Sequence, residues 1–151
     1  TLGVVFDTTR RHLFTGVRGR GARRDGMPIA ASDRSDLSTA VVATGFSYRP
    51  ERRAVQAKAL PLLLPRIANI RCDGSAALDL CAVACGEVDA YFESEVALWD
   101  VAGGRVIAEE AGATVLVRET NGVTSVMAAA PALAGSLLDL LTEAGAAPTT
   151  P

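Results

Sequence analysis

Asp100 is the residue whose type and setting most clearly suggest chemistry. It stands at the start of a helix that the residue pattern predicts over residues 100–111. Its carboxylate could cap that helix by accepting a backbone N–H, or it could donate one oxygen to a hard divalent cation. One aspartate cannot hold such an ion alone, so the pattern leaves both interpretations open.

A second position suited to chemistry is the start of a helix predicted over residues 75–85. Ser75 is the expected N-cap, and Gly74, Ser75 and Ala76 are all small. The first turn of a helix has unpaired N–H groups and a partial positive charge, so small side chains there leave room for a phosphate. The same residues are also typical of an ordinary helix start.

Glu93 is the third candidate. Residues 88–93 alternate between apolar and polar side chains, which predicts a strand with one buried face and with Glu93 at its carboxyl end. Ligands of open α/β sheets bind beyond those ends, where a carboxylate can accept hydrogen bonds from the hydroxyl groups of a polyol. A surface acid is the alternative.

Two adjacent glycines, Gly103 and Gly104, follow Asp100 in the same predicted helix. Each costs about 1 kcal/mol relative to alanine in a helix. Their presence indicates that another element or a ligand approaches this helix closely.

The elements that must position these residues fall into two groups. Residues 2–6, 13–17 and 27–29 read as antiparallel strands, with turns at residues 7–11 and 25–26 and a further Gly-x-Gly turn at residues 19–21. A β-rich run follows at residues 37–44. The remainder alternates as in α/β proteins: helix 50–64, strand 67–71, helix 75–85, strand 88–93, helix 100–111, strand 113–117, a turn at 121–122, strand 123–129 and helix 131–144.

These patterns predict one compact α/β unit. Residues 1–30 would supply antiparallel strands of a central sheet that upstream sequence completes, residues 31–145 a C-terminal α/β subdomain, and residues 146–151 a frayed tail. The chain opens on a residue pattern typical of the middle of a strand and lacks an initiator Met, so we expect it to be part of a longer protein.

Composition narrows the class of protein. The 151 residues are 49% hydrophobic and 21% charged, a balance typical of globular domains. A formal net charge of −2 argues against a general grip on nucleic acid or anionic lipid. No apolar run approaches the roughly 20 residues of a membrane-spanning helix.

Local features could still have specific roles. A basic patch is either a solvated loop or a neighbour of an anionic substrate; it comprises Arg18, Arg20, Arg23 and Arg24. The three cysteines lack the paired spacing of a zinc site. Cys81 and Cys85 lie four residues apart on an apolar helix face and are expected in the core, and free thiols suit a reducing cytoplasm.

Four segments, in this order and spacing, resemble the C-terminal signature of the inositol monophosphatase family, bacterial inositol-1-monophosphatase type. They are residues 74–77 (Gly-Ser-Ala-Ala), 89–93 (Asp-Ala-Tyr-Phe-Glu), 99–103 (Trp-Asp-Val-Ala-Gly) and 110–112 (Glu-Ala-Gly). The resemblance extends more weakly to residues 3–5, 13–15 and 44–46, and so covers nearly the whole chain.

The resemblance implies the C-terminal part of an αβαβα layered sandwich that hydrolyses inositol 1-phosphate, or a similar small polyol phosphate, with Mg²⁺ and a metal-activated water. It makes Asp100 a catalytic metal ligand that also contacts the substrate. Gly74, Ser75 and Ala76 would contact the phosphate and ring, and Glu93 a substrate hydroxyl. A cytoplasmic homodimer is implied as well.

Two departures from the family pattern affect these expectations. Asp73 adds a negative charge directly before the expected phosphate site, and the family's upstream Gly-Glu-Glu and Asp-Pro-x-Asp-Gly-Thr segments are absent. Because those segments supply most metal ligands, we expect this chain alone to be inactive. The alternatives are a phosphatase of the same fold for histidinol phosphate, fructose 1,6-bisphosphate or a nucleotide phosphate, and a non-catalytic assembly module.

Overall fold

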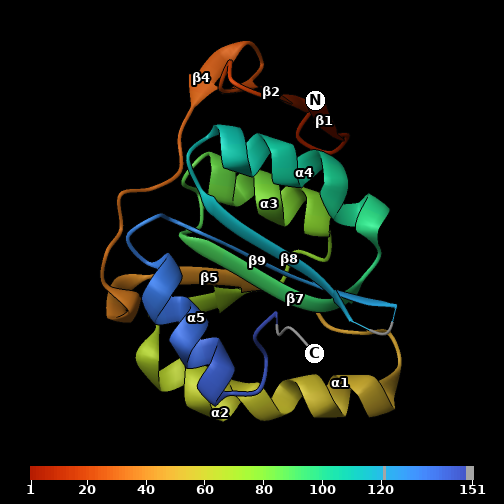
Figure 1. Cartoon of the computed structure of the whole chain (residues 1–151), viewed down its shortest axis with the longest axis vertical. Coiled ribbons are helices and arrows are strands. Elements are labelled where there is room, and N and C mark those ends of the chain that lie inside the picture. Colours follow the sequence, from red (N-terminus) through yellow and green to blue (C-terminus); the bar gives the residue numbers. More distant parts are fainter. Residues whose placement is uncertain (121, 149–151) are drawn as a thin grey trace.

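The chain stacks as alternating layers of sheet and helix (Figure 1), seen in a computed structural model that describes residues 1–120 and 122–148. Sheet A forms one outer layer, and α3 (Ala76–Ala84) and α4 (Leu98–Glu110) lie beneath it. Sheet B follows, and its other face carries α1 (Pro50–Gln56), α2 (Leu60–Leu63) and α5 (Ala134–Glu143). The predicted α/β layered class is confirmed.

Sheet A is an antiparallel meander of β1 (Leu2–Asp7), β2 (His12–Val17), β3 (Ala22–Arg24) and β4 (Met27–Ile29), in that order. Asp7 organises its first turn, because its Oδ1 accepts the N–H groups of Thr9 and Arg10 at 2.9 and 3.0 Å. The antiparallel strands predicted for the first 30 residues are therefore confirmed, each to within a few residues.

The Gly-x-Gly segment of sheet A is a turn, as predicted. Gly19 and Gly21 both have a φ of 76°, in the left-handed region that glycine tolerates. Their N–H groups donate to the two carboxylate oxygens of Glu110, each at 2.9 Å. These bonds lower the pKa of Glu110, that from Gly19 most strongly. The turn therefore fastens sheet A to the end of α4.

Sheet B is mixed. Its strand order is β6 (Asn69–Arg71), β5 (Val41–Thr44), β7 (Ala90–Val96), β9 (Val123–Ala129) and β8 (Thr114–Thr120). β5 runs parallel to β6 and β7, whereas β9 is antiparallel to β7 and β8. β5 ends at Thr44, opposite Phe92, while β7 continues to Val96. The chain leaving β5 therefore passes beside the second half of β7.

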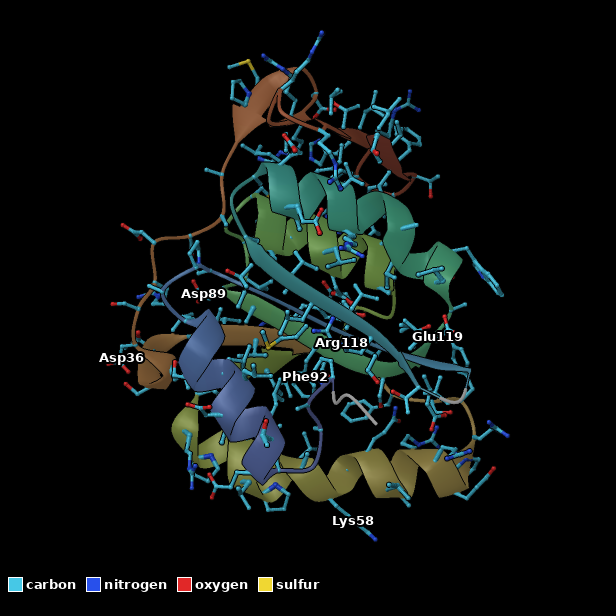
Figure 2. The ribbon with its side chains drawn as sticks, viewed as in Figure 1. Asp36, Lys58, Asp89, Phe92, Arg118 and Glu119 are labelled. Atoms are coloured by element: carbon cyan, nitrogen blue, oxygen red, sulfur yellow. The ribbon has the colours of Figure 1, made fainter. Side chains whose placement is uncertain are left out.

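Both faces of β7 are buried, so the prediction of a strand with one buried face is wrong. Tyr91 packs in the core beneath α3 and α4, and Phe92 packs in a second core with Leu63 and Leu137. Figure 2 shows Phe92 directed toward the α2 and α5 layer. The alternation in the sequence reflects two different cores, because helices cover both faces of the sheet.

Asp89, one of the polar residues that alternate with apolar ones over residues 88–93, has a structural role. It is buried and directly precedes β7, and Figure 2 labels it. Its Oδ2 accepts the N–H of Val41 at 2.9 Å and its Oδ1 accepts the hydroxyl of Ser32 at 2.7 Å. Asp89 thus holds the connection from sheet A to the start of β5.

The paired glycines of α4 allow close approach by other elements. Of the two neighbours that the sequence left open, another element or a ligand, the structure shows other elements. A Cβ on Gly104 would lie 2.8 Å from Leu80 Cβ in α3, and one on Gly103 would lie 3.2 Å from Val4 O in β1. Gly3, also in β1, meets α4 on the side away from α3, where a Cβ would overlap Gly103 O. α4 is held between sheet A and α3 by backbone contacts.

Several element boundaries differ from those predicted. The helix expected over residues 50–64 is divided into α1, a 3-10 turn, α2 and a final 3-10 turn at 64–66, because Pro61 and Pro65 lack the N–H that a continuous helix needs. The run 37–44 begins as a 3-10 turn over Leu37–Thr39, strand 67–71 begins at 69, and helix 131–144 begins at 134. No described helix is long and apolar enough to cross a membrane.

The remaining expectations concern the core cysteines and the tail. Cys81 is fully buried and Cys85 half-buried, so their assignment to the core is confirmed. In the tail, Ala146 donates its N–H to Leu141 O at 2.8 Å and packs on the second core. Asn121 of the predicted turn at 121–122 and residues 149–151 of the tail lie outside the described residues.

The α3–α4 contact gives a first prediction. Gly104→Ala should lower the free energy of unfolding by about 1–3 kcal/mol, because the new methyl group would be forced against Leu80 and the Ala77 carbonyl. Gly135→Ala in α5 is the matched control: nothing lies within 4 Å of its Cβ position, so alanine should raise stability by about 0.5–1 kcal/mol. Urea denaturation followed by circular dichroism measures both, and equal midpoints for Gly104→Ala and wild type would contradict the packing.

Candidate active site

A pocket of about 550 Å³ lies where the predicted site residues meet. Four segments line it: the loop after β5 (residues 46–48), the start of α3 (74–77), the end of β7 (93–96) and the start of α4 (99–100). Gly74, Ser75, Ala76, Glu93 and Asp100 are all among its lining residues. The fold therefore brings together all five predicted site residues, from three separate elements.

The start of α3 forms one wall. Ser75 is the N-cap, as predicted, and its hydroxyl accepts the N–H of Leu78 at 3.4 Å. Gly74 has a φ of 84° and no described atom lies within 4 Å of its would-be Cβ, so the backbone here is open to the pocket. The first turn of α3 faces this space with its partial positive charge.

Asp100 is the third residue of α4, because the helix begins at Leu98 rather than at residue 100. Its Oδ2 accepts the N–H of Ala97 at 3.1 Å. The capping interaction predicted as one alternative is therefore present, although Asp100 caps from inside the helix. The side chain is exposed and lines the pocket, so the cap does not remove its carboxylate from the site.

Glu93 lies within β7 rather than at its end, because β7 continues to pair with β9 as far as Val96. It is nonetheless the first residue beyond the stretch that pairs with β5. The buried Tyr91 hydroxyl donates to its Oε2 at 2.7 Å. Burial raises the pKa of Glu93, the charge of Asp100 raises it further, and the Tyr91 bond opposes the shift.

Gly45 supports the Glu93 carboxylate from behind. A Cβ on Gly45 would overlap all three atoms of that carboxylate, so the acid lies directly against the glycine backbone. Gly45 is buried and does not have a positive φ, which means that the position needs glycine for space and not for backbone conformation. Tyr91 and Gly45 together restrict the orientation of Glu93.

Comparison with known proteins places these features in a family. The model of the inositol monophosphatase family matches residues 1–147. The chain belongs to this family. The predicted resemblance, which rested on four short segments, is thereby confirmed, and it extends over nearly the whole chain.

The individual relatives agree. The chain is 51% identical over 110 residues to the inositol-1-monophosphatase of Mycobacterium leprae, covering 70% of this chain and 38% of that protein. It is 42% identical over 145 residues to Nus factor SuhB of Pasteurella multocida, covering 91% and 54%. The chain spans about half the length of the curated relatives that it matches.

Solved structures of the family share the fold. The chain superposes on Mycobacterium tuberculosis SuhB with a TM-score of 0.90 at 38% identity, covering 97% of this chain and 60% of that one. It superposes on the inositol monophosphatase of Anabaena with a TM-score of 0.84 at 34% identity, covering 94% and 58%. The layers described above are thus part of the inositol monophosphatase fold.

The structure also brings residues to the pocket that sequence reasoning missed. Ser47, Ser94 and Glu95 line it. Glu95 has a φ of 68°, unusual for a residue with a side chain, and stands at a bulge where the β7–β9 register shifts. These residues gave no signal in the sequence, because neither a bulge nor a contact between distant strands follows from local residue types.

The basic patch and Asp73 lie outside the pocket. Arg18 pairs with Glu109 at 3.6 Å, and none of the four arginines of the patch lines the pocket, which favours the interpretation as a solvated face. Asp73 borders a different depression, together with Arg10 and Glu87. The extra negative charge expected beside the phosphate site therefore faces another part of the surface.

Asp79 is an unusual buried acid one turn into α3. Its side chain is 2% exposed, and its Oδ2 has no hydrogen-bond partner within the described residues. Burial, and then the charges of Asp73 and Glu93, raise its pKa from 3.8 to about 7. The carboxyl therefore retains its proton well above the range of an ordinary aspartate.

Asp79 gives a prediction on stability and pH. Because its pKa is higher in the folded than in the unfolded chain, the free energy of unfolding should fall as pH rises from about 4 to about 7, by on the order of 4 kcal/mol. Asp79→Asn should abolish that fall and stabilise the chain at pH 8. Denaturation at several pH values measures it, with the exposed Asp139→Asn as control; parallel pH profiles for wild type and Asp79→Asn would refute the assignment.

Gly45 gives a prediction on packing. Gly45→Ala should lower the free energy of unfolding by about 1–3 kcal/mol, because the methyl group displaces the Glu93 carboxylate from its contact with Tyr91. The cost should shrink in a Glu93→Ala background, where the space is already free. A double-mutant cycle in urea tests this, and an equal cost in both backgrounds would show that the overlap with Glu93 is not the cause.

Proposed function

We propose that this chain is the C-terminal part of a phosphomonoesterase that hydrolyses inositol 1-phosphate or a similar small polyol phosphate. The observation that carries the proposal is the single pocket lined by the start of α3, Glu93 and Asp100. In this proposal the backbone of residues 74–76 binds the phosphate at the positive end of α3. Glu93, whose carboxylate Tyr91 and Gly45 orient, accepts a hydrogen bond from a substrate hydroxyl.

The charge of the pocket supports a role for a cation. Its acidic lining residues are Glu93, Glu95 and Asp100, and no Arg, Lys or His within the described part of the chain lines it. A phosphate would be repelled by these carboxylates unless a cation lay between them. Asp100 has the oxygen donor that Mg²⁺ prefers and is exposed in the pocket.

The described residues do not form a complete metal site. No group of three or more His, Cys, Asp or Glu side chains in residues 1–120 and 122–148 could hold a metal ion. We therefore propose that Asp100 provides one Mg²⁺ ligand and that sequence upstream of this chain provides the others. A bound Mg²⁺ would neutralise charge on the phosphoryl oxygens and favour deprotonation of a water.

The proposal also covers the activity of the isolated chain and the location and oligomeric state of the complete protein. Upstream sequence would complete sheet A as well as the metal site, so the chain by itself would be inactive. The complete protein would be a cytoplasmic homodimer. The substrate could also be histidinol phosphate, fructose 1,6-bisphosphate or a nucleotide phosphate, because these would share the phosphate contacts and differ only at the Glu93 side.

An assembly role is the second candidate. Relatives at 47% and 42% identity are named Nus factor SuhB, a name that does not refer to phosphatase activity. The two candidates differ in the upstream sequence: an Asp-Pro-x-Asp-Gly-Thr segment there favours the enzyme, and its absence favours a module without catalysis.

Asp100→Asn in the complete protein tests the proposal. We expect kcat for inositol 1-phosphate to fall about 100-fold or more, because the variant removes charge that would hold the cation. Isothermal titration calorimetry should show weaker Mg²⁺ binding independently of turnover. Asp139→Asn, on the exposed face of α5, is the control for a lost carboxylate.

Two results would contradict parts of the proposal. Full activity of Asp100→Asn would show that Asp100 is not the metal ligand proposed here. Release of phosphate by the 151-residue chain alone, at a rate comparable with the complete protein, would show that upstream ligands are unnecessary.

A further inference from the structure

Gln56, the last residue of α1, connects two segments that line the pocket. Its Oε1 accepts the N–H of Ser47, in the loop after β5, at 2.8 Å. Its Nε2 donates to the carbonyl and hydroxyl oxygens of Ser94, in β7, at 3.1 and 3.2 Å. One half-buried amide therefore bonds to both segments with its acceptor and its donor.

These bonds lie where the sheet itself no longer sets the spacing. β5 and β7 pair only as far as Thr44 and Phe92, where the Thr44 hydroxyl donates to Phe92 O at 2.8 Å. Beyond that point the β5–β7 ladder stops, and the Glu93 carboxylate lies against Gly45. The width of the pocket between Ser47 and Glu93 therefore depends on side-chain contacts rather than on a strand ladder.

α1 makes further contacts with the same two segments. Arg53 donates to Ser47 O at 3.2 Å, and Arg52 lies 3.5 Å from the carboxylate of Glu95. Both arginines are exposed, so their interactions with the loop and the bulge contribute little by themselves. Gln56 is the more buried of the three and bonds to both segments, which makes it the main link between them.

We propose that Gln56 is a positioning residue for substrate recognition, which fixes the Ser47 loop relative to Glu93 and so adapts the pocket to a hydroxyl-bearing phosphomonoester. The inference rests on the proposed function, and it adds a determinant that does not touch the substrate. Loss of the link lets the Ser47 loop move away from β7. Recognition of substrate hydroxyls beside Glu93 then weakens, while the start of α3 and Asp100, on other elements, stay in place.

The first test measures the link itself in the 151-residue chain, without reference to activity. Gln56→Leu keeps the size of the side chain and removes both hydrogen-bonding groups. Amide hydrogen exchange at Ser47, followed by NMR, should accelerate about tenfold or more, because its N–H loses its acceptor. The matched control is Lys58→Ala, two residues along and directed away from the fold (Figure 2). Unchanged exchange in Gln56→Leu would overturn the inference.

The second test separates recognition from chemistry in the complete protein. Inositol 1-phosphate is compared with p-nitrophenyl phosphate, whose leaving group carries no polyol hydroxyls. Gln56→Leu should raise KM for inositol 1-phosphate about tenfold, as expected for a lost or misplaced hydrogen bond. Its kcat, and both constants for p-nitrophenyl phosphate, should stay within about twofold of wild type.

Gln56→Glu adds a second, non-disruptive variant. It keeps the acceptor for Ser47 but replaces the donor to Ser94 with an oxygen, so it should raise the same KM without unfolding the chain. An equal loss on both substrates, or an unchanged KM in an active protein, would overturn the inference alone. A wild-type protein that cleaves neither substrate would overturn the proposed function and the inference with it.

Discussion

The close contact between α3 and α4 is the constraint on which the site depends. Gly104 allows α4 to lie against Leu80 without an intervening side chain, while Gly103 and Gly3 allow sheet A to press on the other side of the helix. Because interiors are packed as tightly as organic crystals, the helices cannot slide or separate without opening voids. The starts of α3 and α4, where residues 74–76 and Asp100 lie, are therefore held at a fixed separation along one edge of the pocket.

The opposite edge of the pocket, formed by the loop after β5 and the end of β7, is positioned by different interactions. Parallel pairing of β5 with β7 stops two residues before the Ser94 position, and the polar residues beyond it are ordered by side chains rather than by strands. Glu93 is oriented by Tyr91 and by the bare backbone of Gly45, and the bulge at Glu95 shifts the register of β7 on β9. The wall of the pocket formed by the starts of α3 and α4 is thus fixed by helix packing. The shape of the opposite wall, formed by the loop after β5 and the end of β7, is set by a few hydrogen bonds. That division suits a site in which charge chemistry and substrate recognition are performed by different walls.

Electrostatics distinguish the pocket from the rest of the surface. Burial raises the pKa values of Glu93 and Asp79, and a neighbouring negative charge raises each further: that of Asp100 for Glu93, and those of Asp73 and Glu93 for Asp79. Elsewhere, acids such as Glu110 and Asp25 accept backbone N–H groups that lower their pKa. Of the two acids with raised pKa values, Glu93 lines the pocket, and Asp79 lies one turn into α3, whose start forms one wall.

Much of this protein was determined by local sequence. Ser75 caps α3, the turns of sheet A follow from Asp7 and the glycines, and the alternation of strands and helices predicted the layered class, because capping, turn chemistry and periodicity act over a few residues. The four short motifs were sufficient to indicate the family. The two buried faces of β7 and the extension of that strand past Glu93 do not follow from local sequence, because burial depends on which elements cover a sheet. The breaks in the helix at residues 57–66 have a local cause, since Pro61 and Pro65 lack the N–H that a continuous helix needs.

Only the tertiary structure decided how the site is built. Asp100 reads from sequence as either a cap or a ligand, and the fold makes it a cap whose carboxylate is still exposed in the pocket. The Gly45–Glu93 contact and the bonds of Gln56 to Ser47 and Ser94 join residues whose proximity no local pattern predicts. Residue type and spacing specify what a side chain can do, whereas its partners are set by chain packing over long sequence separations.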